Sequence, residues 1–102
     1  MDCIFCKIAN GEIPSDTVFE DDNFKVILDL SPASKGHMLI LPKTHARDIT
    51  ELSEDIAGKA IVLAAKLCKA SMAALGATGF NTLANTGESA GQTVFHCHIH
   101  VI

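Results

Sequence analysis

Hydrophobic residues occur in short runs that polar and turn-forming residues interrupt, as expected of a sheet built from short strands. These runs predict five strands, which cover residues 17–20, 24–30, 37–42, 79–85 and 94–102. Gly, Pro, Asp and Asn mark most of the turns between them. Strands linked by short turns indicate a mostly antiparallel sheet.

One long helical pattern lies between the third and fourth predicted strands, where apolar side chains recur at helical spacing. They are Ile56, Ala60, Leu63, Ala64, Leu67 and Ala74. Ser53 is a suitable N-cap, and Gly76 and Gly79 mark the end of the helix. Residues 3–11 predict a shorter helix closed by Gly11. The elements together predict an α+β domain with one main helix and a short N-terminal helix.

The last strand carries three histidines at alternate positions, within the segment HCHIHVI. Because side chains alternate along a strand, His96, His98 and His100 share one face, and we expect the apolar residues between them to face the core. A plain polar edge strand is the alternative. The first and third histidines lie about 13 Å apart along a strand, so a metal shared by all three would be badly strained. We expect one histidine to bind a metal or a structural partner and the other two to take part in a reaction.

The ligands for such a metal are present elsewhere in the chain. Cys3 and Cys6 form a Cys-x-x-Cys pair, and His45 directly follows a predicted strand. With His96 they make a Cys2His2 set suited to tetrahedral zinc. A redox dithiol or two buried thiols remain alternatives, although a thioredoxin-like motif belongs near a βαβ unit that is not predicted here.

The loop before the last strand, NTGESAGQT, has the character of an anion site. Gly87 and Gly91 let the backbone approach a ligand closely. Four of its side chains offer hydrogen-bond donors: Asn85, Ser89, Gln92 and Thr93. An ordinary polar connection would look similar, but this loop leads directly into His98 and His100. Donors beside histidines favour a phosphate-bearing ligand.

Composition narrows the class of protein. The 102 residues suffice for a single domain, and 48% of them are apolar. A net charge of −4 with no basic cluster argues against nucleic acid as a partner. The longest apolar run, residues 60–75, is too short to span a bilayer, and no signal-peptide pattern opens the chain. We therefore expect a cytoplasmic protein without a membrane partner.

HCHIHVI matches, at every position, the His-φ-His-φ-His-φ-φ motif (φ apolar) of the histidine triad (HIT) family. Three longer segments also resemble that family, in the same order, and its bacterial nucleotide-binding branch most of all: CIFCKIANGEIPS, LDLSPASKGHMLILPKTH and NTGESAGQTVFHCHIHVI. The resemblance implies the HIT fold, a single domain over residues 1–102 and a homodimer. Relatives continue past the motif, so we expect the usual C-terminal tail to be missing.

The resemblance also implies roles for individual residues. His98 would be the nucleophile, His100 would stabilise charge on the phosphate, and Thr93 would relay a proton. Asn85, Gln92 and Thr93 would contact the phosphate, and Asp29 would accept hydrogen bonds from the ribose. Four side chains would wall the base: Phe5, Ile8, Phe19 and Ile27. His37 would either orient a catalytic histidine or be an ordinary buried histidine.

The implied activity is attack on the α-phosphate of a nucleoside phosphoramidate or related conjugate, through a nucleotidyl-histidine intermediate. The ligand would be a purine nucleotide of the AMP or GMP type. Zinc would be structural, and no organic cofactor is implied. Two alternatives remain: hydrolysis of dinucleoside polyphosphates, and a nucleotide-binding regulator without catalysis.

Overall fold

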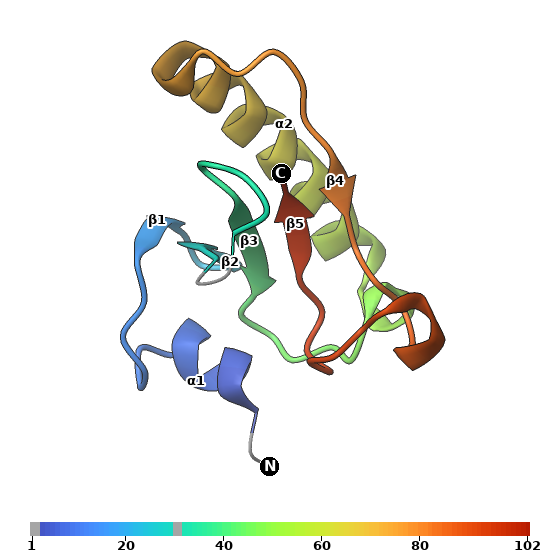
Figure 1. Ribbon diagram of the computed structural model, residues 1–102. Helices are drawn as coiled ribbons and strands as arrows, with labels where there is room; N and C mark the ends of the chain where they lie inside the picture. The colour runs from blue at the N-terminus through green and yellow to red at the C-terminus, as the bar shows by residue number, and fades with distance from the viewer. Residues whose placement is uncertain (1–2, 30–31) are drawn as a thin grey trace.

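The computed structural model describes residues 3–29 and 32–102, and its strands form one antiparallel sheet in the order β1-β2-β3-β5-β4 (Figure 1). The strands are β1 (Thr17–Glu20), β2 (Phe24–Leu28), β3 (Met38–Pro42), β4 (Thr82–Leu83) and β5 (Ile99–Val101). The α+β architecture with five antiparallel strands, one main helix and a short N-terminal helix is confirmed.

The two α-helices pack against opposite faces of the sheet. Helix α2 (Glu54–Leu75) covers one face, with a core of Phe24, Val26, Met38, Ile40, Ala60, Leu63, Ala64, Leu67 and Val101. Helix α1 (Ile4–Ala9) contributes Ile8 to a smaller cluster on the other face, with Ile27, Leu39 and Leu41. His100 pairs with Leu39 across the sheet and therefore lies on the α1 face. Two 3₁₀ turns, η1 (Ile49–Glu51) and η2 (Glu88–Ala90), lie in loops.

Helix α2 begins and ends where its capping residues predict. The Ser53 hydroxyl accepts a hydrogen bond from the Ile56 amide, and acidic residues in the first turn suit the positive end of the helix dipole. Gly76 takes φ +68°, a left-handed conformation that ends the helix. Ala74, expected on the core side, is exposed. Of the helices in the described part of the chain, none has the length and apolar character needed to cross a membrane.

Helix α1 is short, and side chains at both ends hold it in place. The Cys3 sulfur accepts a hydrogen bond from the Cys6 amide at 3.3 Å and acts as the N-cap. Lys25, a buried residue of β2, donates from Nζ to the Ile8 carbonyl at 3.0 Å. Gly11 follows the end of the helix with φ +80°, as its sequence position predicts. Six residues form too few intrahelical bonds to be stable alone, so these contacts and the sheet stabilise the helix.

The last two strands are shorter than the sequence pattern predicts. The expected strand over residues 79–85 reduces to Thr82–Leu83, and that over 94–102 reduces to Ile99–Val101. Residues 94–96 bend, and the Cys97 amide donates to the Ala46 carbonyl, which belongs to a loop, at 2.6 Å. Strict alternation therefore fails before Ile99, and Phe95 is exposed rather than in the core. The predicted end of the second strand, Leu30, lies outside the described residues.

Candidate active site and zinc site

Four side chains from three separate segments converge, with one ligand atom of each within 4.8 Å of the others. They are Cys3 and Cys6 at the start of α1, His45 after β3, and His96 before β5. The Nδ1 atom of His96 lies 3.4 Å from the sulfur of Cys3, 3.3 Å from that of Cys6 and 3.2 Å from Nδ1 of His45. The sulfur of Cys6 lies 3.3 Å from Nδ1 of His45.

These separations match the edges of a zinc tetrahedron. Zinc–nitrogen bonds of about 2.05 Å and zinc–sulfur bonds of about 2.3 Å give edges of about 3.3 Å between nitrogens and about 3.6 Å between nitrogen and sulfur. The observed edges run from 3.2 to 3.4 Å. The donor set, two sulfurs and two imidazoles, is also one that zinc prefers. The residues therefore fit the ion.

The hydrogen bonding of His96 prepares it to be a ligand. Its ring is fully buried, and Nε2 donates to the carbonyl of Pro42 at 2.8 Å, which leaves the Nδ1 lone pair directed at the sulfurs. Burial lowers the pKa of His96, so the ring stays neutral. Burial, with the neighbouring Cys3 thiol, raises the pKa of Cys6 to about 11. Such a thiol loses its proton at neutral pH only beside a cation, so metal binding here releases protons.

His98 shows the opposite arrangement of its two ring nitrogens. Its Nδ1 lies 2.8 Å from the backbone carbonyl of His96 and donates to it, because a carbonyl can only accept. In a neutral ring this leaves Nε2 without a proton and with a free lone pair. The ring is half-buried and has an edge-to-face contact with Phe5. His98 therefore presents a nucleophilic nitrogen in a defined tautomer.

His100 is oriented by a chain of hydrogen bonds that runs back to the loop after β2. Nδ1 of His37 accepts from the Ala33 amide at 3.0 Å, so Nε2 of His37 carries the proton. This Nε2 lies 2.9 Å from Nδ1 of His100 and 3.4 Å from a carboxylate oxygen of Asp29. A distance of 2.9 Å suits a hydrogen bond better than a metal-bridged pair of nitrogens, which needs about 3.3 Å.

His37 therefore donates to His100, and His100 keeps its proton on Nε2 as a hydrogen-bond donor. Burial is the main cause that lowers the pKa of His100, so the ring is neutral near pH 7. His98 and His100 lie with ring centroids 5.1 Å apart. One ring thus offers a lone pair beside a ring that offers an N–H, a combination suited to attack on phosphorus with stabilisation of the phosphate oxygens.

Gln92 organises the loop before this strand through three hydrogen bonds. Its Oε1 accepts from the Gly87 amide at 2.9 Å, and Nε2 donates to the carbonyls of Arg47 and Val94 at 2.7 and 3.1 Å. The side chain is buried, so Gln92 holds the loop through these bonds. Of the other loop residues predicted for the site, Thr93 is exposed and Asn85 is half-buried.

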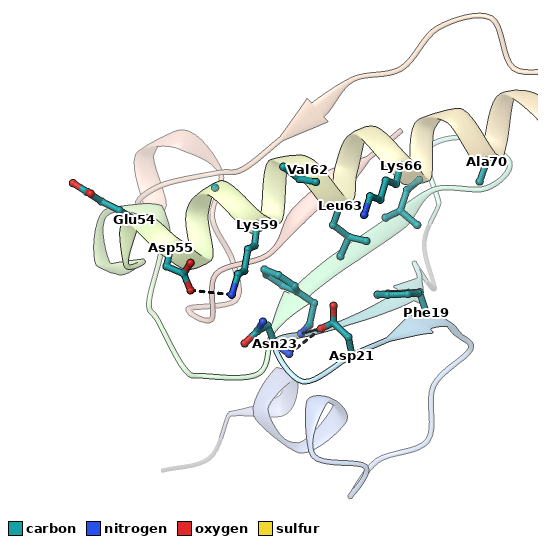
Figure 2. A pocket seen from close by; sticks show the side chains of 13 residues that line it. Phe19, Asp21, Asn23, Glu54, Asp55, Lys59, Val62, Leu63, Lys66 and Ala70 are labelled. Atoms are coloured by element: carbon teal, nitrogen blue, oxygen red, sulfur yellow. Dashed lines mark hydrogen bonds and ion pairs between the residues drawn. The ribbon is translucent and has the colours of Figure 1, made fainter.

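The predicted base wall divides between the two faces of the sheet. Ile8, Ile27 and Phe5 cluster on the α1 face, where His98 and His100 also lie. Phe19 pairs with Val26 across the sheet and lies on the α2 face (Figure 2). There it lines a groove beside helix α2 instead of the histidine side. The structure thus does not bring Phe19 to the candidate site, because the alternation of β1 directs it to the other face.

The sequence pattern contained no signal for several groups that hold the site. The carbonyl of Pro42 fixes the tautomer of His96, the amide of Ala33 fixes that of His37, and the carbonyl of Arg47 anchors Gln92. All three are backbone groups, whose role does not depend on the side chain and leaves no residue type to recognise.

Comparison with known proteins gives the family. Residues 10–102 match the HIT domain. The chain belongs to the HIT family. Protein hit of Bacillus subtilis is 44% identical over 100 residues, which cover 98% of this chain and 69% of that protein.

Two further HIT relatives carry names of nucleotide hydrolases. Adenylylsulfatase HINT3 of Arabidopsis thaliana is 42% identical, over 99% of this chain and 51% of that protein. Adenosine 5'-monophosphoramidase hnt1 of Schizosaccharomyces pombe is 41% identical, over all of this chain and 74% of that protein. The chain thus spans about half of the Arabidopsis protein and about three quarters of the yeast one.

Solved structures of the family share this fold closely. A HIT family protein from Bacillus anthracis superposes with a TM-score of 0.95 at 46% identity, covering 99% of this chain and 72% of that one. A zinc-bound histidine triad family protein from Mycobacterium smegmatis superposes with a TM-score of 0.95 at 39% identity, covering all of this chain and 74% of that one. Zinc is therefore found in a protein of this family with the same fold.

Proposed function

We propose that this HIT protein hydrolyses nucleoside phosphoramidates or related nucleotide conjugates at the α-phosphate, with His98 as the nucleophile. The observation that carries the proposal is the 2.8 Å hydrogen bond from Nδ1 of His98 to the His96 carbonyl, which leaves Nε2 free to attack. Relatives named as an adenylylsulfatase and an adenosine monophosphoramidase support hydrolysis of an adenylyl compound.

The reaction proceeds in two displacements. Nε2 of His98 bonds to the α-phosphorus, and the phosphorus–nitrogen bond to the leaving amine breaks. The amine departs with a proton that the Thr93 hydroxyl, which is exposed, relays from solvent. Water then attacks the phosphorus and gives up a proton to solvent, the bond to Nε2 breaks, and nucleoside monophosphate leaves while His98 regains its neutral ring. His100, held as an Nε2 donor by His37, stabilises charge on the phosphate oxygens in both steps.

Other residues of the candidate site bind the nucleotide. Asn85 contacts the phosphate, and Gln92 shapes the phosphate loop from its buried position. Asp29 accepts hydrogen bonds from the ribose hydroxyls with the carboxylate that also lies near His37. Phe5, Ile8 and Ile27 wall a purine base from the α1 side, in keeping with their common apolar cluster.

The zinc site has a structural role in this proposal. Cys3, Cys6, His45 and His96 would hold the ion. The ion would bind α1, the β3 loop and the segment before β5 together, and structural zinc contributes strongly to the folding of small domains. No step of the reaction needs the metal, because the attacking nitrogen and the donor to the phosphate both come from histidine rings outside its ligand set.

We also propose a homodimer that forms along helix α2 and strand β4. Ile61, Met72 and Leu75 of α2 and Leu83 of β4 are large apolar side chains that are 46–57% exposed. Strand β4 is an edge strand, paired only with β5 among the described strands. Such an edge invites pairing with a second copy. Sedimentation of the protein should give twice the chain mass of 10.8 kDa, and a monomer at micromolar concentration would contradict the proposal.

The covalent step has a direct test. Intact-protein mass spectrometry after a brief, acid-free quench with an adenosine phosphoramidate should detect an added adenylyl group on the wild type and none on His98→Ala. Turnover by His98→Ala should fall by about 10³-fold or more, since the nucleophile is absent. His45→Ala, which removes an imidazole from the zinc set and keeps the nucleophile, should still form the adduct, at a reduced rate. AMP binding without an adduct or turnover would instead favour a nucleotide-binding regulator.

A further inference from the structure

Phe5 connects the zinc ligands to the nucleophile. It lies between Cys3 and Cys6 in the chain, and its ring contacts both His96 and His98. We propose that Phe5 is a positioning residue that the zinc-binding segment holds against His98, so that an intact zinc site sets the orientation of the nucleophilic ring. The inference rests on the proposed role of His98 and deepens it.

The contact between the two rings is close and directional. The ring centroids of Phe5 and His98 lie 4.9 Å apart with an interplanar angle of 83°, an edge-to-face geometry. The ring of His96 lies 6.1 Å from that of Phe5 at 80°. Phe5 therefore touches the last ligand of the zinc set and the nucleophile with one ring.

Two routes run from the metal ligands to the ring of His98. The polar route passes through His96, whose ring is a ligand and whose carbonyl accepts from Nδ1 of His98. The apolar route passes through Cys3 and Cys6, which flank Phe5 at the start of α1. Both contacts depend on the four zinc ligands. A displacement of α1 therefore weakens the contact of Phe5 with His98 even when the hydrogen bond from His98 to the His96 carbonyl remains.

His98 needs a second restraint because a single hydrogen bond fixes one ring nitrogen but not the plane of the ring. The imidazole is half-buried, and its other ring neighbour is His100 at 5.1 Å. An aromatic edge perpendicular to the imidazole limits rotation about the Cβ–Cγ bond. Without Phe5, the Nδ1 bond to His96 competes with other orientations, in which Nε2 no longer faces the phosphorus.

A role for Phe5 in the base wall alone makes different predictions. A wall contributes to nucleotide binding, so its loss raises KM and spares a substrate without a base. Positioning acts on the ligand-free enzyme and on every substrate alike. It therefore lowers kcat to the same extent for an adenosine phosphoramidate and for a phosphoramidate of ribose 5-phosphate, which carries no base.

The experiment combines nitrogen-15 NMR of labelled histidine with kinetics, at a fixed pH of about 8 where the rings are neutral. Two-bond proton–nitrogen spectra of the wild type should show His98 as a single Nδ1–H tautomer. Phe5→Leu should shift or broaden these signals and lower kcat about tenfold on both substrates, and Phe5→Tyr should restore both. Phe95→Leu is the matched control, because Phe95 is an exposed phenylalanine near the triad.

The dependence of His98 on zinc is tested with Cys6→Ser, whose zinc content is measured by elemental analysis. It should lose zinc and disturb the His98 signals as Phe5→Leu does, whereas Phe5→Leu should keep its zinc. Unchanged His98 signals in Phe5→Leu, or a rise in KM confined to the substrate with a base, would overturn the inference. Because the spectra are recorded without ligand, they report on positioning even if His98→Ala retained turnover and the proposed function failed.

Discussion

In the zinc site, His96 donates its Nε2 proton to the carbonyl of Pro42 and turns Nδ1 toward two sulfurs. In the active site, two residues further along, His98 donates its Nδ1 proton to the carbonyl of His96 and keeps Nε2 for the ligand. In the proposed roles, the same type of side chain is a metal ligand in one place and a nucleophile in the other. The backbone carbonyl that each ring meets decides which nitrogen carries the lone pair.

The two sites also differ in what surrounds the lone pair. His96 is completely buried, and its free nitrogen meets the ligand atoms of three other side chains. His98 is half-buried, and its ring neighbours are Phe5 and His100. Converging sulfur and nitrogen atoms in a closed shell suit a cation, whereas a single lone pair beside a donor N–H suits a reacting phosphate. The comparison predicts that damage to the active site should leave zinc bound, whereas loss of zinc should lower stability and slow the chemistry without abolishing it.

The largest effect is expected on stability from the zinc site. Cys6→Ser should remove stoichiometric zinc, lower the free energy of unfolding by about 3 kcal/mol or more and lower Tm by more than about 10 °C. Covalent chemistry at His98 should persist, at a reduced rate. Elemental analysis and calorimetry measure the change. Cys68→Ser, on helix α2, is the control and should keep its zinc. A wild-type protein that contains no zinc would contradict the zinc-site proposal.

The next effect is expected on turnover from the donor chain of the active site. His37→Ala removes the proton donor to Nδ1 of His100, so His100 can exchange its tautomer and lose the Nε2 donor. We expect kcat to fall about 100-fold with zinc content unchanged. Steady-state kinetics with metal analysis make the measurement. If kcat of His37→Ala equalled that of the wild type, His100 would keep its tautomer without His37.

A smaller effect is expected from the loop that precedes the three histidines. Gln92→Leu leaves the Gly87 amide and the carbonyls of Arg47 and Val94 without their partner. The cost should be about 1–3 kcal/mol in unfolding free energy, with a modest fall in kcat/KM. Gln92→Glu is the informative control, since it can still accept from Gly87 but cannot donate. If it matched Gln92→Leu in chemical denaturation, the two donated bonds would carry the effect.

The smallest effect is the dependence of stability on pH. Burial lowers the pKa of His100 in the folded state, while the unfolded value is about 6.5. Below that value the unfolded chain binds a proton that the folded chain does not, so this stability is present above about pH 6.5 and is lost as the pH falls. The slope for one such group is at most about 1.4 kcal/mol per pH unit. Denaturation of wild type and His100→Gln between pH 7.5 and 5.5 should give a shallower slope in the variant.

Local sequence signals predicted the helices well and the last strands poorly. Ser53 and Gly76 cap α2 as their residue types require, because a cap depends on groups within a few residues. Alternation of apolar residues extended the strand of the triad back to residue 94, but only Ile99–Val101 pair with neighbours. Strand length depends on partners far away in the chain, which a local pattern does not contain.

The sequence by itself determined the chemistry available to this protein. Two cysteines three residues apart, a histidine after a strand and three alternate histidines were sufficient to predict a Cys2His2 zinc set and a separate phosphate site. It also determined the apolar faces that make an α+β fold. These features follow from residue type and short-range spacing, which the chain carries in every conformation.

Only the tertiary structure decided which nitrogen of each histidine ring keeps its lone pair and which side chains reach the site. The carbonyls of Pro42 and His96 select the tautomers, and the face of β1 separates Phe19 from the histidines. The tautomer of each histidine, and the face of the sheet on which a side chain lies, depend on backbone groups brought together from distant segments. Such contacts exist only after the sheet has formed, because any residue can supply a carbonyl and only its position makes it a partner.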